Sequence, residues 1–308
     1  MEHPPPTAIP QRRLLVTGAS GFLGWHLCRA AQAAWQVEGT YHRHAPQPLP
    51  GVTLHGIDLG ELDAIAPWLE ALAPAAVIHT AALSQPNRCE QDPAQSYRVN
   101  VEATRVLAEC CARHQIPFVF TSTDQVFDGQ SPPYSETSPP SPINFYGHHK
   151  AEAEALIQTL HPTAAICRLP LLYGPPSPTA ESFLQGFLRT LKAGQPLNLF
   201  TDEFRTPAYV EDVAAGLLLA LEKATGLLHL GGPERLSRYD FGLRMAGVFG
   251  LDPSLLIPGR QADVTMPARR PADVSSDSQR AFALGYWPRG AIAGLEATRD
   301  WNLSEANC

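Results

Sequence analysis

Cysteine, lysine and long apolar runs are scarce in this chain, and each shortage excludes a class of protein. The six cysteines form no CxxC pair and no small-domain framework, which excludes a disulfide-stapled scaffold and predicts reduced thiols in a cytoplasmic protein. No apolar stretch reaches 18 residues and no charged-then-apolar leader opens the chain, so we expect neither a membrane-spanning helix nor a signal peptide. A net charge of −7 without a basic run argues against nucleic acid as a partner.

What is present indicates an ordinary globular protein. Apolar residues make up 44% and charged residues 17% of 308 residues, enough for one large α/β domain or a domain with a smaller lobe. Residues 1–11, which include Pro4, Pro5 and Pro6, are expected to form a flexible tail.

Strand and helix patterns alternate along the first half of the chain. Buried strands are predicted at 13–17, 36–41, 52–55, 75–79, 117–121 and 165–169. Helices are predicted at 22–34, 62–72, 97–114 and from about 145 to 160. This alternation predicts an α/β protein with a doubly wound, Rossmann-type parallel sheet and helices on both faces.

The alternation breaks after Tyr173. Helices are predicted at 183–192, 210–222 and 239–249, a strand at 227–230, and one or two short helices within 276–301. We therefore expect a Rossmann domain at 12–173, a segment at 206–230 that packs back onto it, and a smaller C-terminal α/β substrate lobe of 174–205 and 231–308. A Pro-rich loop at 131–142 is expected to border the active site.

A glycine-rich loop follows the first predicted strand and opens the first predicted helix. Gly18 permits a tight turn, Gly21 lets the backbone approach a pyrophosphate, and Gly24 lets the helix pack against the sheet. The helix N-terminus supplies free amides and a positive dipole end, so we predict a dinucleotide site rather than a turn without a ligand. The same prediction covers the other loop residues, Ser20, Phe22 and Leu23.

The end of the second predicted strand indicates which dinucleotide binds. NAD sites usually place an acidic residue there, but residues 40–44 contain none. Arg43 could pair with a 2′-phosphate, which favours NADP(H) over NAD(H), although it could also be a solvated loop cation. Asp58 and Leu59 would lie beside the adenine, and Asp58 could equally be a helix N-cap.

Tyr146 and Lys150 form a Tyr-x-x-x-Lys pair. With eight tyrosines and three lysines in the chain, such a pair arises by chance only about 0.08 times. Residues four apart share one face of a helix, and a cation beside a phenol lowers the phenol's pKa. The pair can therefore transfer protons. His148 and His149 lie between them and are expected to be surface residues that face away.

These motifs, in this order, resemble the extended short-chain dehydrogenase/reductases. The chain looks most similar to the dTDP-4-dehydrorhamnose reductase branch, and the regulatory β subunit of methionine adenosyltransferase is similar too. The resemblance covers about residues 12–301. Besides the glycine loop and the Tyr–Lys pair, it rests on residues 79–82, 99–101, 122–129, 168–174, 204–213 and 270–275.

The resemblance implies roles for five residues. Tyr146 would be the general acid, and Lys150 would hold the nicotinamide ribose and lower the Tyr146 pKa. Thr123, at the end of the fifth strand, would hydrogen-bond the same substrate carbonyl, with Ser122 as a less favoured alternative because strand alternation turns it away. Ala81 and Ala82 would let the cofactor lie against the backbone.

The implied reaction is NADPH-dependent reduction of a nucleotide-linked 4-keto-6-deoxy sugar. Asp124, Gln125 and Arg205 would contact that substrate, although Arg205 could instead pair with Glu203 or Asp212. Dehydratases of the superfamily carry an acid where this chain has Gln125, and an amide cannot replace it. The alternatives are a non-catalytic NADP-binding regulatory subunit and a sugar-nucleotide epimerase. No metal site is predicted, and a homodimer is a possible assembly.

Overall fold

The computed structural model describes residues 12–43, 45 and 47–305, so the expected tail at residues 1–11, His44 and Cys308 lie outside the described residues. Within that part of the chain, no helix combines the length and the apolar character that crossing a bilayer requires.

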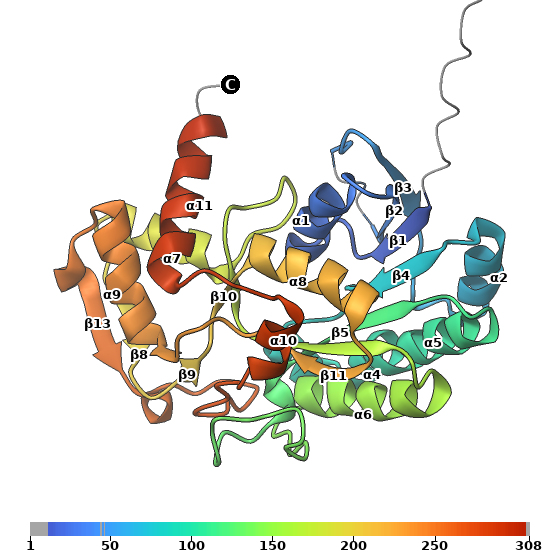
Figure 1. The fold of residues 1–308 in the computed structure, drawn as a ribbon. Helices are drawn as coiled ribbons and strands as arrows, with labels where there is room; N and C mark the ends of the chain where they lie inside the picture. The colour runs from blue at the N-terminus through green and yellow to red at the C-terminus, as the bar shows by residue number, and fades with distance from the viewer. Residues whose placement is uncertain (1–11, 44, 46, 306–308) are drawn as a thin grey trace, which may run out of the picture.

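A parallel sheet of seven strands runs through the described residues in the order β11-β6-β5-β4-β1-β2-β3 (Figure 1). Its strands are β1 (Arg13–Thr17), β2 (Gln36–Tyr41), β3 (Val52–Gly56), β4 (Ala76–His79), β5 (Phe118–Thr123), β6 (Ala165–Leu169) and β11 (Gly226–His229). The chain runs outward from β1 to β3 and then returns to β4, so the strand order reverses beside β1. Ligands of such sheets bind at that reversal, outside the carboxyl ends of the strands. The predicted Rossmann-type fold is confirmed.

Helices cover both faces of the sheet (Figure 1). One face carries α1 (Phe22–Ala31) and α8 (Val210–Lys223), and the other carries α2 (Leu62–Leu72), α5 (Ala103–Arg113) and α6 (Phe145–Leu160). Alternation along β1 separates the two cores, because Leu14 and Val16 pack beneath α1 and α8 whereas Leu15 packs beneath α2 and α5.

The C-terminal lobe has its own apolar core, centred on Tyr173, Phe241 and Leu295. Three helices surround it, namely α7 (Phe183–Lys192), α9 (Arg238–Phe249) and α11 (Ala291–Glu305). Beside them, β8 (Leu197–Phe200) pairs in parallel with β13 (Leu256–Gly259). The smaller elements here are β7 (Leu172–Tyr173), β9 (Phe204–Arg205), β10 (Ala208–Tyr209) and β12 (Leu236–Ser237). The short helix α10 (Gln279–Leu284) packs instead against α8 and β11 of the large sheet, although the sequence assigned it to this lobe.

The predicted helix at 97–114 is wrong in detail. The structure has α4 (Pro93–Tyr97), a π-helical turn (Arg98–Glu102) and then α5, with a further short helix, α3 (Pro86–Gln91), before them. Both short helices begin at a proline, which suits the first helical position because it lacks an N–H. A π-turn inserts one residue into the helix and redirects the side chains there, as is common near functional sites.

Candidate active site

A cavity of about 1020 Å³ opens at the carboxyl ends of β1, β4 and β5 and continues to the C-terminal lobe. Every site residue predicted from the sequence lines it. These residues are Gly18, Ser20, Gly21, Phe22, Leu23, Gly24, Arg43, Asp58, Leu59, Ala81, Ala82, Thr123, Asp124, Gln125, Tyr146, Lys150 and Arg205. Residues far apart in the sequence therefore meet in one space large enough for two ligands side by side.

The glycine loop forms a backbone cradle at one end of the cavity. Gly18 has φ of +73°, a left-handed conformation that favours glycine. A Cβ at Gly24 would lie 2.1 Å from the Gly18 carbonyl oxygen, so the first turn of α1 needs glycine there. Among the residues that the structure describes, no side chain caps α1, whose N-cap residue is Gly21. Its first amides are thus free to bind an anion, and the loop fits a pyrophosphate.

Polar side chains gather beyond this cradle, at the ends of β2 and β3. The His42 imidazole lies 3.0 Å from the Asp58 carboxylate, and Arg43 is exposed beside them. Asp58 Oδ1 accepts from the Gly60 amide at 2.8 Å, while the N-cap position of α2 belongs to Glu61, so the N-cap alternative for Asp58 is wrong. Arg98 of the π-turn also lines this end, a position that no sequence signal indicated.

Tyr146 lies in the first turn of α6, which Asn144 caps by accepting from the Gly147 amide at 2.8 Å. Burial raises the pKa of the phenol, the Asp124 charge raises it further, and a hydrogen bond with Thr123 acts in the opposite direction. The sequence predicted a lowered pKa, but burial dominates. A phenol that stays protonated at neutral pH can act as a proton donor rather than as a base.

Lys150 lies one turn further along the same face of α6. Its side chain is buried, and Nζ lies 3.9 Å from the centre of the Phe120 ring. Burial lowers the pKa of the amine from 10.5 to about 7, partly offset by the Glu154 carboxylate. A charged amine here is costly, which is typical of residues kept for function rather than for stability.

Replacement of Lys150 by Met should stabilise the fold at pH 6 by roughly 1–4 kcal/mol, because it removes a buried charge. Between about pH 7 and 10.5 the unfolded chain binds more protons at this group than the folded chain, so the wild-type stability rises with pH there. The difference in unfolding free energy between Lys150→Met and the wild type should therefore shrink as the pH rises from about 7 to 10.5. Urea unfolding at pH 6 and pH 10 measures it, with the exposed Lys192→Met as the matched control. A Lys150→Met variant less stable than wild type at pH 6 would contradict this account.

The opposite end of the cavity holds a cluster of arginines and acids. Arg205 lies between two carboxylates, with Nε 3.7 Å from Asp124 and Nη2 3.6 Å from Glu203. Arg238 shares Glu203 at 3.6 Å, and Arg270 donates to Asn87 Oδ1 at 3.0 Å. Arg205 therefore pairs with Glu203, one of the two partners considered from the sequence. The other, Asp212, pairs with Arg289 instead.

Three buried atoms of this cluster lack a hydrogen-bond partner within the described residues, namely Asp124 Oδ2 and the Nη1 atoms of Arg238 and Arg270. Burial raises the pKa of Asp124 to about 6 against the opposing Arg205 charge, and burial lowers the pKa of Arg238 to about 10. Three guanidinium groups face two carboxylates here. The surplus positive charge and the unused N–H groups make this end of the cavity suited to an anionic ligand.

Two sequence expectations near the site are wrong. His148 is exposed as expected, but His149 is 6% exposed because α4 packs over it, and its Nδ1 lies 2.8 Å from Ser96 Oγ. The loop at 131–142 does not line the cavity, because Tyr134 stacks on Phe127 with ring centres 4.1 Å apart and holds the loop elsewhere.

The chain is similar in sequence to a known protein family and to proteins of known name. A family model described as the RmlD substrate binding domain matches residues 12–289. The probable low-salt glycan biosynthesis reductase Agl14 of Haloferax volcanii is 34% identical over 261 residues, covering 83% of this chain and 86% of that protein. The methionine adenosyltransferase 2 subunit beta of Rattus norvegicus is 30% identical over 289 residues, covering 91% and 85%.

A solved structure is similar as well. The hypothetical dTDP-4-dehydrorhamnose reductase of Sulfolobus tokodaii superposes with a TM-score of 0.80 at 28% identity, covering 91% of this chain and 98% of that one. The resemblance read from the sequence motifs is confirmed by these matches.

Proposed function

The chain belongs to the family of the RmlD substrate binding domain, and we propose that it is an NADPH-dependent reductase of a nucleotide-linked 4-keto-6-deoxy sugar. The observation that carries the proposal is the shared cavity. Its glycine cradle, its Thr123–Tyr146–Lys150 group and its arginine end would hold a dinucleotide, a carbonyl and an anion in sequence.

Each residue at the centre of the cavity has a distinct part in the proposed reaction. A bound nicotinamide supplies the hydride. Tyr146 donates its proton to the carbonyl oxygen, which is consistent with a phenol that burial keeps protonated. Thr123 hydrogen-bonds the same oxygen, and Lys150 binds the cofactor ribose and then gains a partner for its buried charge.

The arginine end supports a nucleotide-linked substrate. The buried Nη1 atoms of Arg238 and Arg270 have no hydrogen-bond partner in the part of the chain that the structure describes, and a diphosphate would accept from them. Arg205, held between Asp124 and Glu203, would add a third positive charge. Gln125 accepts from Asn144 Nδ2 at 3.1 Å and is held at the edge of the substrate space.

The proposed preference for NADP(H) rests on the adenosine end. Arg43 and Arg98 both line it, and of the two acids there, Asp58 and Glu61, Asp58 is already engaged by His42 and the Gly60 amide. A 2′-phosphate would find cations there. A cytoplasmic location is proposed as well, since the described cysteines 28, 89, 110, 111 and 167 are all free.

The test is NADPH oxidation with a panel of nucleotide keto sugars, repeated with NADH. We expect turnover with a dTDP-linked 4-keto-6-deoxy sugar. We also expect kcat/KM to favour NADPH at least about tenfold, because one charge-assisted contact contributes roughly 1.5–3 kcal/mol. Equal use of NADH would contradict the assigned role of Arg43.

A second candidate is a cofactor-binding subunit without turnover, favoured by the 30% identity to the methionine adenosyltransferase 2 subunit beta. The two functions separate in the same experiment. Saturable NADPH binding with no oxidation by any keto sugar, together with a stoichiometric partner enzyme in a pull-down, would replace the reductase proposal.

A further inference from the structure

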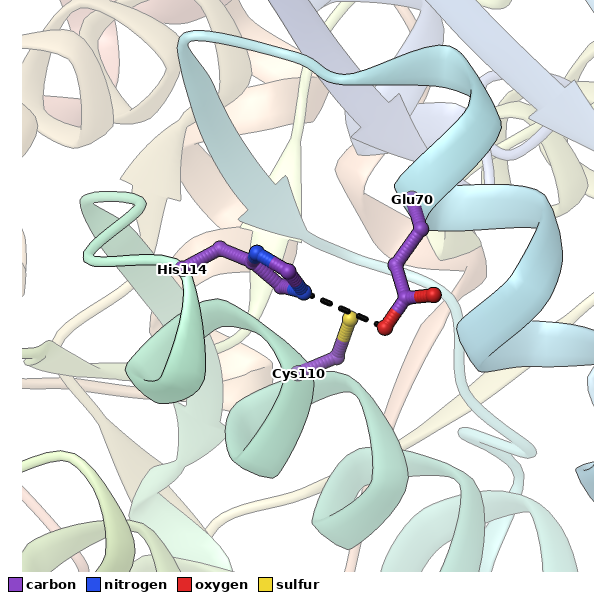
Figure 2. Close-up of side chains that lie close together, drawn as sticks. All are labelled: Glu70, Cys110 and His114. Carbon is purple, nitrogen blue, oxygen red and sulfur yellow. Dashed lines mark hydrogen bonds and ion pairs between the residues drawn. The ribbon is translucent and has the colours of Figure 1, made fainter.

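Away from the cavity, three side chains of metal-ligand type meet between α2 and α5. Glu70, Cys110 and His114 place one carboxylate oxygen, the sulfur and one ring nitrogen all within 4.8 Å of one another. His114 Nε2 lies 3.1 Å from Glu70 Oε1. Figure 2 shows the three side chains pointing toward one another, with the sulfur beside the line that joins His114 and Glu70.

The helix geometry explains why these residues converge. Cys110 and His114 are four residues apart at the end of α5 and so share one face. The His114 amide donates to the Cys110 carbonyl at 3.1 Å, which continues the helical geometry through His114. Glu70 comes from the last turn of α2, which packs against α5.

We propose that Glu70, Cys110 and His114 form a binding site for a zinc-class divalent cation. A thiolate, an imidazole and a carboxylate are the ligands that zinc takes in proteins, and three such ligands leave a fourth tetrahedral position for water. Zinc bond lengths imply ligand separations of about 3.3 Å between nitrogen and oxygen and about 3.6 Å between sulfur and nitrogen. The observed 3.1 Å between His114 and Glu70 is close to the first of these.

The surroundings suit a cation that can be reached from solvent. The side chains of Glu70 and His114 are 42% and 43% exposed, so water can complete the coordination, while Cys110 is buried beneath them. The site also lies at the C-terminal end of α5, where the helix dipole favours positive charge. The sequence predicted no metal here, because Glu70 is 40 residues away from Cys110 and only the fold joins them.

One neighbour opposes the metal and gives a sharp test. Arg113 Nη1 lies 3.3 Å from Glu70 Oε1, the same oxygen that His114 contacts. A divalent cation would have to displace this guanidinium. Arg113→Ala should therefore increase zinc affinity. If the three side chains only pack together and bind no metal, this substitution would have no such effect.

The experiment titrates zinc chloride into full-length protein freed of metal by a chelator. We expect one saturable equivalent and a thermal midpoint that rises with zinc. Glu70→Gln and His114→Gln alter exposed side chains, so they should fold normally, and each should weaken zinc binding by at least about tenfold. With cobalt in place of zinc, the wild type should show a thiolate-to-cobalt charge-transfer absorption that Cys110→Ser loses.

Glu109→Gln is the matched control, because Glu109 lies on the same helix and pairs with Arg105 instead. It should bind zinc like the wild type. Absence of saturable zinc binding, or binding that persists unchanged in all three ligand variants, would overturn the site. Binding that is lost equally in the Glu109→Gln control would overturn it too.

Discussion

Replacement of Tyr146 by Phe is expected to lower keto-sugar reduction by about 10²–10⁴-fold, the range that a positioned proton donor contributes. Phe keeps the ring that fills this buried position and removes only the hydroxyl. NADPH affinity should stay near that of wild type, because the loss falls on the transition state rather than on binding. Single-turnover NADPH oxidation measures the rate, and nicotinamide fluorescence measures the affinity.

The matched control is Tyr97→Phe, another loss of one phenol hydroxyl close by. Tyr97 lies outside the cavity lining and donates to Glu152 at 2.8 Å on the surface. Its removal should leave the rate unchanged. A Tyr146→Phe variant that reduces the substrate within a few-fold of the wild-type rate would show that another group delivers the proton.

The half of the site that we propose binds the dinucleotide could be predicted because its chemistry is local. The glycine loop needs a strand before it and a helix after it, and both are visible in the apolar pattern. Tyr146 and Lys150 share a helix face through spacing alone. The structure places the predicted residues in one cavity, and substitutions at Tyr146 and Lys150 test the roles proposed for them.

Most of the arginine end could not be predicted in the same way, although Arg205 and Asp124 were expected to contact the substrate. Arg205, Arg238 and Arg270 come from three separate segments. Only the folded lobe brings Arg205 and Arg238 to Asp124 and Glu203, and Arg270 to Asn87 near the Glu203 charge. A solvated arginine and a buried one look the same in a sequence. The prediction that His149 is a surface residue was wrong for a related reason. It assumed that the outer face of α6 is free, whereas α4 covers that face.

Glu154→Gln is expected to destabilise the protein by about 3–5 kcal/mol, because it leaves the buried Arg168 charge without a counter-ion. Glu154 Oε2 accepts from Arg168 Nη2 at 2.7 Å, and Oε1 accepts from Ser122 Oγ at 2.5 Å. Both charged side chains are almost fully buried, at 3% and 1% exposure. Urea unfolding monitored by fluorescence measures the change.

The control is Glu109→Gln, which breaks a half-exposed pair with Arg105 four residues earlier and should cost at most about 0.5 kcal/mol. A Glu154→Leu, Arg168→Met double variant should recover much of the loss, since it removes both charges together. If Glu154→Gln costs no more than the surface control, the buried pair does not hold this region together.

The position of Glu154 also links stability to the proposed chemistry. Tyr146, Lys150 and Glu154 follow one another at intervals of four, so they form one face of α6. Glu154 fastens that face to Ser122 of β5 and Arg168 of β6, next to Thr123. Loosening the anchor should therefore reduce turnover in the fraction of Glu154→Gln that remains folded, even though Glu154 lies outside the cavity lining. Wild-type turnover in that folded fraction would show that Tyr146 and Lys150 are positioned without it.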